Sequence, residues 1–239
     1  MSYYGLFKHV LLGPGLKAFY QPWVEGAEHI PDEGGAILAS NHLAVSDSFF
    51  LPLVVKRKVV FLGKSEYFTG KGVKGYVTKS FMSGVGTIPV HRGGGRASEA
   101  ALRTGLQVLQ SGDLLGIYPE GTRSVDGRLY RGKTGVARMA IEAGVPIIPV
   151  AMIGTDVAQP LGKKMPSREN IGVRIGPALR LENFAGRQDD REVLREATDM
   201  VMQAIAELSG QEYVDRDSGV YKRELAQEAR QARGSDRPE

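Results

Sequence analysis

The sequence contains no cysteine, which excludes disulfides, thiol nucleophiles and cysteine-based metal sites together. It has only four histidines, without the spacing of a zinc site, and no G-x-S-x-G elbow, so neither metal chemistry nor a serine nucleophile is indicated. No apolar run approaches the ~20 residues of a membrane-spanning helix, and no cleavable signal pattern opens the chain. A reducing, cytoplasmic compartment is compatible with this composition, and any action at a membrane is expected from its surface.

What is present suits one folded domain. At 239 residues and 42% apolar content the chain can bury a sizeable core. The net charge of +4 and the pI of about 9.2 give a mild basic excess. Such an excess serves solubility, or it attracts phosphates and anionic lipids.

The first 25 residues are apolar and aromatic, with scattered lysines and a Gly13-Pro14-Gly15 break. At 100° per residue, most apolar side chains fall on one broad arc of a helix, with Leu12 as the exception, and Gly5, Lys8 and His9 lie opposite. The arc comprises Tyr3, Tyr4, Leu6, Phe7, Val10 and Leu11. Two interpretations remain open: a helix that docks on its own domain, and a helix that lies in the bilayer interface.

From residue 34 onward, short apolar runs alternate with helical patterns. Strands are predicted at GAILAS, KVVFLG, GTIPVHR, LLGIYP, VPIIPVAMIG and IGVRIG. Helices are predicted over residues 96–110, 133–143 and 189–208, the last with a core-facing stripe. This alternation predicts a single-domain α/β fold, in which a mixed or mostly parallel sheet is flanked by helices and the reactive residues lie on loops at strand ends.

The last thirty residues are mostly charged and polar. They predict a short helix over residues 221–232 and a frayed or disordered end. The sequence therefore predicts an amphipathic segment over residues 1–25, a central domain over residues 26–209 and a charged tail over residues 210–239.

One stretch matches a nucleotide-binding loop. In GRLYRGKT, Gly127, Gly132, Lys133 and Thr134 have P-loop spacing and precede a predicted helix. A P-loop should leave a buried strand directly, however, and Gly127 lies well beyond LLGIYP on a polar connection. Bulky side chains also fill the interior of the loop, where a tight nest of N–H groups is needed. A P-loop nucleotide-binding protein is therefore the alternative prediction for the function of this chain.

A second stretch, NHLAVSD, places His42 five residues before Asp47. On one continuous helix these positions would differ by about 140°, so a turn has to intervene if the two side chains are to meet. With Ser46 as N-cap, Asp47 would lie in the first turn of a helix running into SFFLPLV, and His42 on the loop after GAILAS. A histidine beside a carboxylate is a proton acceptor near neutral pH.

Three further blocks follow in order: GVGTIPVHR, IYPEGTRS and VPIIPV. With NHLAVSD they resemble the four signature blocks of the glycerolipid acyltransferases, specifically the 1-acylglycerol-3-phosphate acyltransferase (PlsC-like) family, over about residues 26–154. The resemblance implies a glycerol-3-phosphate acyltransferase-like fold. It also implies transfer of a fatty acyl group from a thioester of coenzyme A or acyl carrier protein to lysophosphatidic acid or a related glycerol phosphate, giving phosphatidic acid.

The resemblance also assigns roles to individual residues. His42 would be the general base, and Asp47 would orient it, as in the histidine–carboxylate half of a serine-protease triad. Direct attack of an alcohol on a thioester needs no enzyme nucleophile and no cofactor beyond the co-substrate. Arg92 and Arg123 would bind the acceptor phosphate, together with Glu120, Gly121 and Thr122 of the third block. Glu120 would position Arg123 or a glycerol hydroxyl, and N–H groups near Gly121 would stabilise the oxyanion.

Lys64, Lys71 and Lys74 form a basic run between the first two blocks. They form either a solvated face or a contact with donor phosphates or lipid headgroups. One departure from the family pattern stands before Arg92, where His91 replaces the usual acidic residue.

The expected partners are thus the phosphorylated acceptor, acyl-CoA or acyl carrier protein, and a membrane surface, with no nucleic acid and no metal. The expected location is peripheral, on the cytoplasmic face of the cell membrane. A lipid-binding module without turnover, and an acceptor such as glycerol 3-phosphate or another lysophospholipid, remain alternatives.

Overall fold

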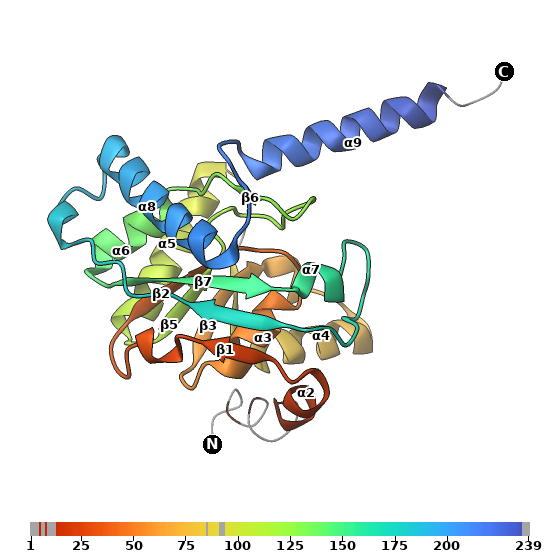
Figure 1. Cartoon of the computed structure of the whole chain (residues 1–239), viewed down its shortest axis with the longest axis horizontal. Coiled ribbons are helices and arrows are strands. Elements are labelled where there is room, and N and C mark those ends of the chain that lie inside the picture. Colours follow the sequence, from red (N-terminus) through yellow and green to blue (C-terminus); the bar gives the residue numbers. More distant parts are fainter. Residues whose placement is uncertain (1–4, 6–7, 9–12, 85, 91–93, 236–239) are drawn as a thin grey trace.

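The computed structural model describes residues 5, 8, 13–84, 86–90 and 94–235. A seven-stranded sheet forms its centre, in the order β1-β8-β7-β2-β5-β3-β4 (Figure 1). The strands are β1 (Trp23–Glu25), β2 (Ala36–Ser40), β3 (Val59–Lys64), β4 (Thr87–Val90), β5 (Leu114–Ile117), β7 (Ile147–Ile153) and β8 (Gly172–Ile175). Neighbouring strands are parallel except β7 and β8. The predicted mixed, mostly parallel α/β sheet is confirmed.

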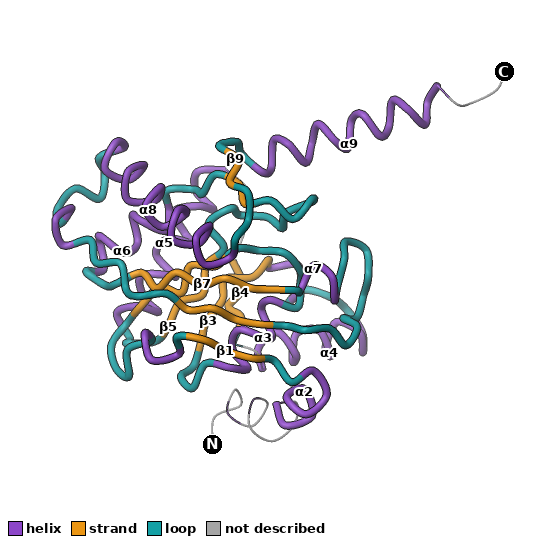
Figure 2. The backbone as a smooth tube through the Cα atoms, in the orientation of Figure 1, coloured by secondary structure: helices purple, strands orange, loops and turns teal. Residues whose placement is uncertain are grey.

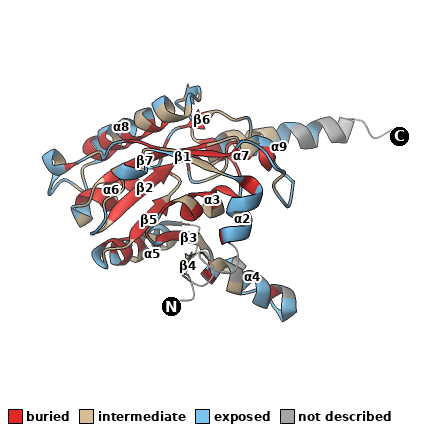
Figure 3. Cartoon of the chain, turned by 60° about the horizontal axis from the view of Figure 1, so that its bottom comes forward, coloured by how far each residue is buried: buried red, intermediate tan, exposed pale blue. Residues whose placement is uncertain are grey.

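Helices cover both faces of the sheet, and the alternation along β2 shows how. Ile37 and Ala39 face a core formed with α5 (Gly94–Gln110), α6 (Gly135–Ala143) and α8 (Arg191–Ser209). Ala36 and Leu38 face the other core, which includes α3 (Asp47–Val54) and Tyr20 of α2 (Gly13–Tyr20). The strands are therefore buried between two helical layers, as Figure 3 shows. A strand buried on both faces has to be apolar throughout, which is why these runs could be found in the sequence.

The remaining elements lie at the margins. The helices α4 (Gly72–Gly84) and α7 (Thr155–Ala158) follow β3 and β7, and β6 (Leu129–Tyr130) pairs in parallel with β9 (Tyr213–Val214). The last helix, α9 (Ser218–Ser235), extends away from the body of the molecule (Figure 2) and is longer than predicted. No helix in the part of the chain that the structure describes is long and apolar enough to cross a membrane.

The N-terminal segment is described only in part. Its predicted apolar arc, from Tyr3 to Leu11, lies outside the described residues. Lys8 is described, and its amino group donates hydrogen bonds to the carbonyl oxygens of Val55, Lys56 and Arg57, just after α3. Lys8 thus binds its own domain. The sheet also begins before residue 26, because β1 lies inside the predicted N-terminal segment, residues 1–25, and pairs with β8.

Candidate active site

His42 and Asp47 meet in the turn between β2 and α3. Nδ1 of His42 lies 2.9 Å from Oδ2 of Asp47. Because a carboxylate accepts hydrogen bonds, Nδ1 carries the imidazole proton and Nε2 keeps its lone pair. The Asp47 side chain is fully buried, whereas that of His42 remains 17% exposed. The predicted contact is confirmed, and it leaves an acceptor nitrogen on the accessible side of the ring.

The turn itself holds Asp47 in place. Oδ2 of Asp47 also accepts hydrogen bonds from the backbone N–H groups of Leu43 and Ala44, at 2.8 and 2.9 Å. Together with the His42 contact, these bonds fix Oδ2 of Asp47 at the N-terminus of α3. Ser46 occupies the N-cap position as predicted, but its hydroxyl makes no capping bond, and its N–H donates to the side chain of Gln159 instead. The side-chain acceptor for the N–H groups of this turn is therefore Asp47, and not Ser46.

Tyr118, which the sequence analysis did not single out, lies directly against the imidazole. The two ring centroids are 3.8 Å apart and the ring planes differ by 9°. The Tyr118 hydroxyl is 2.9 Å from that of Ser48, in the first turn of α3. Burial raises the pKa of Tyr118 well above its ordinary value, so the hydroxyl stays protonated. His42 is therefore held on its edge by Asp47 and on its face by Tyr118.

Glu120 is buried, with a side chain only 1% exposed. Its two carboxylate oxygens accept hydrogen bonds from the backbone N–H groups of His42 and Tyr130, at 3.2 and 3.0 Å. Burial raises the pKa of this carboxyl from 4.5 to about 7. Each oxygen thus has one partner inside the protein, and the role of Glu120 toward Arg123 or a glycerol hydroxyl stays a prediction. Glu120 joins the His42 loop to β6.

The third sequence block touches the first through its backbone as well. The N–H of Ser124 donates to the carbonyl oxygen of His42 at 2.8 Å, so both peptide groups of the histidine bind this block. Arg123, the neighbour of Ser124, is half-buried and has no hydrogen bond or ion pair with any described residue. The guanidinium thus has no partner among the described residues, and its predicted role at the acceptor phosphate stays a prediction.

Gly121 makes the turn that this block requires. Its φ is +72°, and a Cβ there would lie 3.0 Å from Cε of Lys133. Its own N–H donates to the carbonyl oxygen of Tyr118, so this N–H is not available as an oxyanion donor. The next two N–H groups, of Thr122 and Arg123, make no hydrogen bond within the described residues. These two are the available donors.

Four other predicted residues are not tested. Arg92 lies outside the described residues, as does His91. The backbone of Lys64 ends β3 and that of Lys74 lies in α4, but their side chains are not described; Lys71 precedes α4 and is exposed. Their roles stay predictions.

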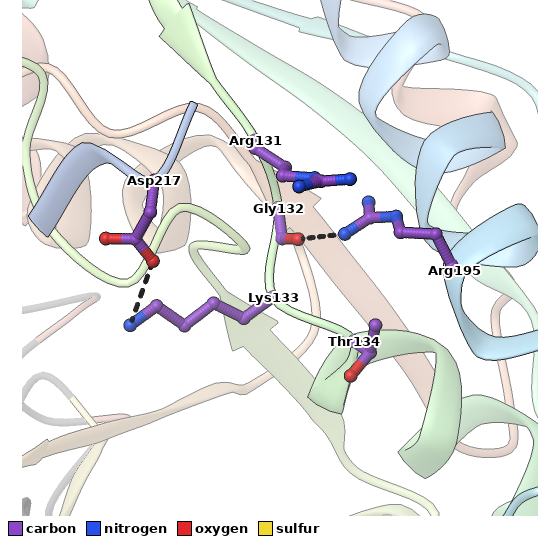
Figure 4. A pocket seen from close by; sticks show the side chains of 6 residues that line it. All are labelled: Arg131, Gly132, Lys133, Thr134, Arg195 and Asp217. Carbon is purple, nitrogen blue, oxygen red and sulfur yellow. Dashed lines mark hydrogen bonds and ion pairs between the residues drawn. The ribbon is translucent and has the colours of Figure 1, made fainter. Parts of the chain in front are cut away.

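The nucleotide-loop alternative fails on its backbone hydrogen bonds. The N–H groups that should cradle a phosphate already donate inside the protein: Leu129 to Glu212, Tyr130 to Glu120, Arg131 to Arg216 and Lys133 to Pro119. An open pocket of about 480 Å³ does lie beside Lys133 (Figure 4). There, Lys133 faces Asp217 and Arg195 donates to the carbonyl oxygen of Gly132. These hydrogen bonds fix the loop as a short strand and a turn, and its bonded N–H groups are not available to bind phosphates.

Asn41 explains how the loop leaves the sheet. Its side-chain amide is fully buried and exchanges two hydrogen bonds with the backbone of Met152 in β7, at 3.1 and 2.7 Å. The side chain continues the β2–β7 ladder by one position after the backbone has turned away. His42 therefore starts from a fixed point at the carboxyl end of β2, where active sites of parallel sheets lie.

Comparison with known proteins agrees with this geometry. A family model described as acyltransferase matches residues 21–153, which is more than half of the chain and includes His42, Asp47 and the third block. The chain belongs to the acyltransferase family. The predicted resemblance is thereby confirmed.

Members with related sequences carry consistent names. A chloroplastic 1-acyl-sn-glycerol-3-phosphate acyltransferase of Arabidopsis thaliana is 31% identical over 61% of this chain and 40% of its own length. The 1-acyl-sn-glycerol-3-phosphate acyltransferase of Bacillus subtilis is 27% identical over 77% of this chain and 86% of its own. This chain thus spans less than half the length of the Arabidopsis relative.

Among solved structures, the 1-acyl-sn-glycerophosphate acyltransferase PlsC from Thermotoga maritima has the same fold. The match has a TM-score of 0.61 and 25% identity, and it covers 83% of this chain and 80% of the other. The similarity thus extends well beyond the residues that the family model matches.

Proposed function

We propose that this protein transfers a fatty acyl group from a thioester to a hydroxyl of 1-acyl-sn-glycerol 3-phosphate, giving phosphatidic acid. The observation that carries this proposal is the orientation of His42. Its Nδ1 is fixed by Asp47 at 2.9 Å, and its Nε2 makes no hydrogen bond to a described residue. The names of the relatives from Bacillus subtilis and Thermotoga maritima support the choice of acceptor.

His42 is the general base of the proposed reaction. As the acceptor oxygen attacks the thioester carbonyl carbon, its proton passes to Nε2 of His42, and the buried Asp47 carboxylate stabilises the imidazolium. The tetrahedral intermediate then collapses, the carbon–sulfur bond breaks, and the departing sulfur takes the proton back from His42. The products are an ester and a free thiol. No acyl-enzyme stage is required, in keeping with a chain that has no cysteine.

Arg123 is the phosphate-binding residue of the proposal. A planar guanidinium suits a phosphate because it donates two parallel hydrogen bonds, and this one has no described partner inside the protein. Arg92 joins it in the proposed site. The N–H groups of Thr122 and Arg123 are the proposed donors to the oxyanion, in place of that of Gly121.

The donor is an acyl thioester of coenzyme A or acyl carrier protein, and the enzyme acts on acceptors held in a membrane. The proposed location is the cytoplasmic face of the cell membrane, with residues 1–25 as one point of attachment. Lys64, Lys71 and Lys74 contact donor phosphates or headgroups in this proposal.

An acyltransferase assay over a panel of substrates tests the proposal. Lysophosphatidic acid, glycerol 3-phosphate, a lysophospholipid with a substituted phosphate and a monoacylglycerol are each offered with coenzyme A and carrier-protein thioesters. We expect acylation of lysophosphatidic acid with release of free thiol in equal amount. Absence of transfer to every phosphorylated acceptor, with either donor, would refute the proposed activity.

A further inference from the structure

Two exposed apolar surfaces are found at the end of the molecule where β2 and β7 terminate. The first is on α4, where Val73, Tyr76 and Val77 are 82%, 73% and 59% exposed. These positions are three and four residues apart, so they share one face of the helix. Figure 3 shows α4 projecting beyond the sheet, which leaves this face without cover from the described residues. We call it the α4 face.

The second surface is formed by α2 and the segment after α7. Phe19, Leu161 and Met165 are all exposed. The two parts are in contact, because the Tyr20 hydroxyl donates to the carbonyl oxygen of Pro166 at 2.9 Å, and the Arg168 guanidinium lies over the Phe19 ring. Figure 1 places α2, α4 and the segment after α7 toward the same end of the molecule (right and lower right).

The segments that form these surfaces are basic. Residues 13–24, 71–84 and 157–168 contain no aspartate or glutamate and seven lysine or arginine residues. The whole chain has a net charge of only +4, so the rest of it is net acidic. Lys71 and Lys79 accompany the α4 face, and Lys163, Lys164 and Arg168 accompany the second surface; all five are exposed. The basic excess of this protein is therefore confined to the segments that also expose apolar side chains.

This combination fits an anionic lipid surface. Apolar and aromatic side chains enter the boundary between headgroups and acyl chains, while lysines bind anionic headgroups around them. Two separate protruding surfaces can rest on a plane together. The same end carries His42, so an acceptor embedded in the bilayer would lie next to the base that acts on it.

We infer that the α4 face and the surface formed by Phe19, Leu161 and Met165 bind anionic membranes and hold the active site at the bilayer. The inference rests on the proposed function for its biological meaning, but the binding itself is measured without catalysis.

Vesicle co-sedimentation tests it directly. The full chain is mixed with vesicles of phosphatidylcholine and phosphatidylglycerol, and with vesicles of phosphatidylcholine alone. We expect binding to the mixed vesicles, weakened by salt, and about tenfold weaker binding by a Val73→Gln/Tyr76→Gln double variant and by Met165→Gln. Met200→Gln is the matched control, because Met200 is an exposed methionine on α8, away from this end (Figure 1). Equal binding by the α4 variant and the control would overturn the inference.

Activity on two forms of the acceptor separates the inference from the proposed function. With a short-chain, monomeric lysophosphatidic acid and no vesicles, the double variant should retain the kcat and KM of the wild type. With the acceptor presented in mixed vesicles, its rate should fall about tenfold. Equal losses with both forms would assign the α4 face to the acceptor site and contradict membrane binding. If the wild type transfers no acyl group at all, the proposed function fails, and the vesicle-binding result is still decided on its own.

Two other partners would also overturn the inference. If the α4 variant abolishes a dimer seen by light scattering, the occupant is a second copy of this chain. If it loses binding to acyl carrier protein while vesicle binding is unchanged, the face belongs to the donor.

Discussion

The ring of Tyr118 lies parallel to the imidazole of His42, with 3.8 Å between centroids. The Tyr118 ring also stacks on Phe61 of the core, with 5.6 Å between ring centroids, so it lies between the core and the candidate base. Asp47 fixes the direction of the imidazole in its plane, and Tyr118 fixes the plane. Nε2 therefore has one orientation, which is the condition for efficient proton transfer at a defined atom.

Replacing Tyr118 by Leu should lower kcat about 10- to 100-fold, because the imidazole loses the surface that fixes its plane. The KM for the acceptor should change little, since the Tyr118 ring lies against the face of the imidazole and its hydroxyl is already bonded to Ser48. Tyr118→Phe, which keeps the ring and loses only the hydrogen bond with Ser48, should retain most activity.

Phe61→Leu is the matched control for this prediction. Phe61 is 4% exposed and stacks on the tyrosine, but not on the histidine. It should lose a similar amount of stability, about 0.5–3 kcal/mol, with a much smaller fall in kcat. Equal falls in kcat for the two variants at equal stability would show that Tyr118 has only a packing role.

Replacing Arg123 by Ala should raise the KM for lysophosphatidic acid about 10- to 100-fold, as expected for loss of a charge-assisted hydrogen bond to phosphate. The use of a monoacylglycerol, which has no phosphate, should be unchanged. Arg187→Ala serves as the control, since that arginine is exposed and paired with Asp190 far along the chain. A parallel loss with both acceptors would remove Arg123 from the phosphate site.

Glu120 predicts a pH dependence of stability. Its pKa is raised on folding from 4.5 to about 7, so between these values the folded state binds more protons than the unfolded state. The contribution of Glu120 to the free energy of unfolding is therefore greatest below pH 4.5 and is lost as the pH rises through about 7, by up to about 3 kcal/mol.

Glu120→Gln removes this titration. Urea unfolding at several pH values across the window should show that the wild-type stability, relative to the variant, falls with rising pH. A constant difference would contradict the assignment. The variant should also lose activity above about pH 7, where the ionised carboxylate offers two acceptors to the N–H groups of His42 and Tyr130 and a glutamine offers only one.

Most of the sheet could be predicted, and the exceptions have physical causes. The six predicted strands are β2, β3, β4, β5, β7 and β8, most of them apolar because both faces are buried. β1, β6 and β9 were missed because each has only two or three residues and depends on pairing with distant chain. α4 was missed because Gly72, Gly75 and Gly84 lower the helix propensity of a segment that tertiary contacts nevertheless make helical.

The candidate site was predicted where it is local and missed where it is not. The His42–Asp47 contact joins two residues five positions apart in one turn, and residue types and spacing suffice to find it. Tyr118 is 76 residues from His42, and the only signal was an aromatic residue at a strand end directly before PEG. The two backbone contacts of Glu120 could not be predicted, because the N–H groups that need its carboxylate can be identified only in the folded chain.

The central claim, that His42 accepts the proton of the acceptor hydroxyl, is tested most directly by His42→Ala in a pre-steady-state acyl-transfer assay with saturating thioester and lysophosphatidic acid. The variant should fold and bind the acceptor with wild-type affinity. Its rate of ester formation should fall at least about 10³-fold, near the upper range for loss of a positioned base. Ester formation at the wild-type rate in a folded His42→Ala protein would contradict the account.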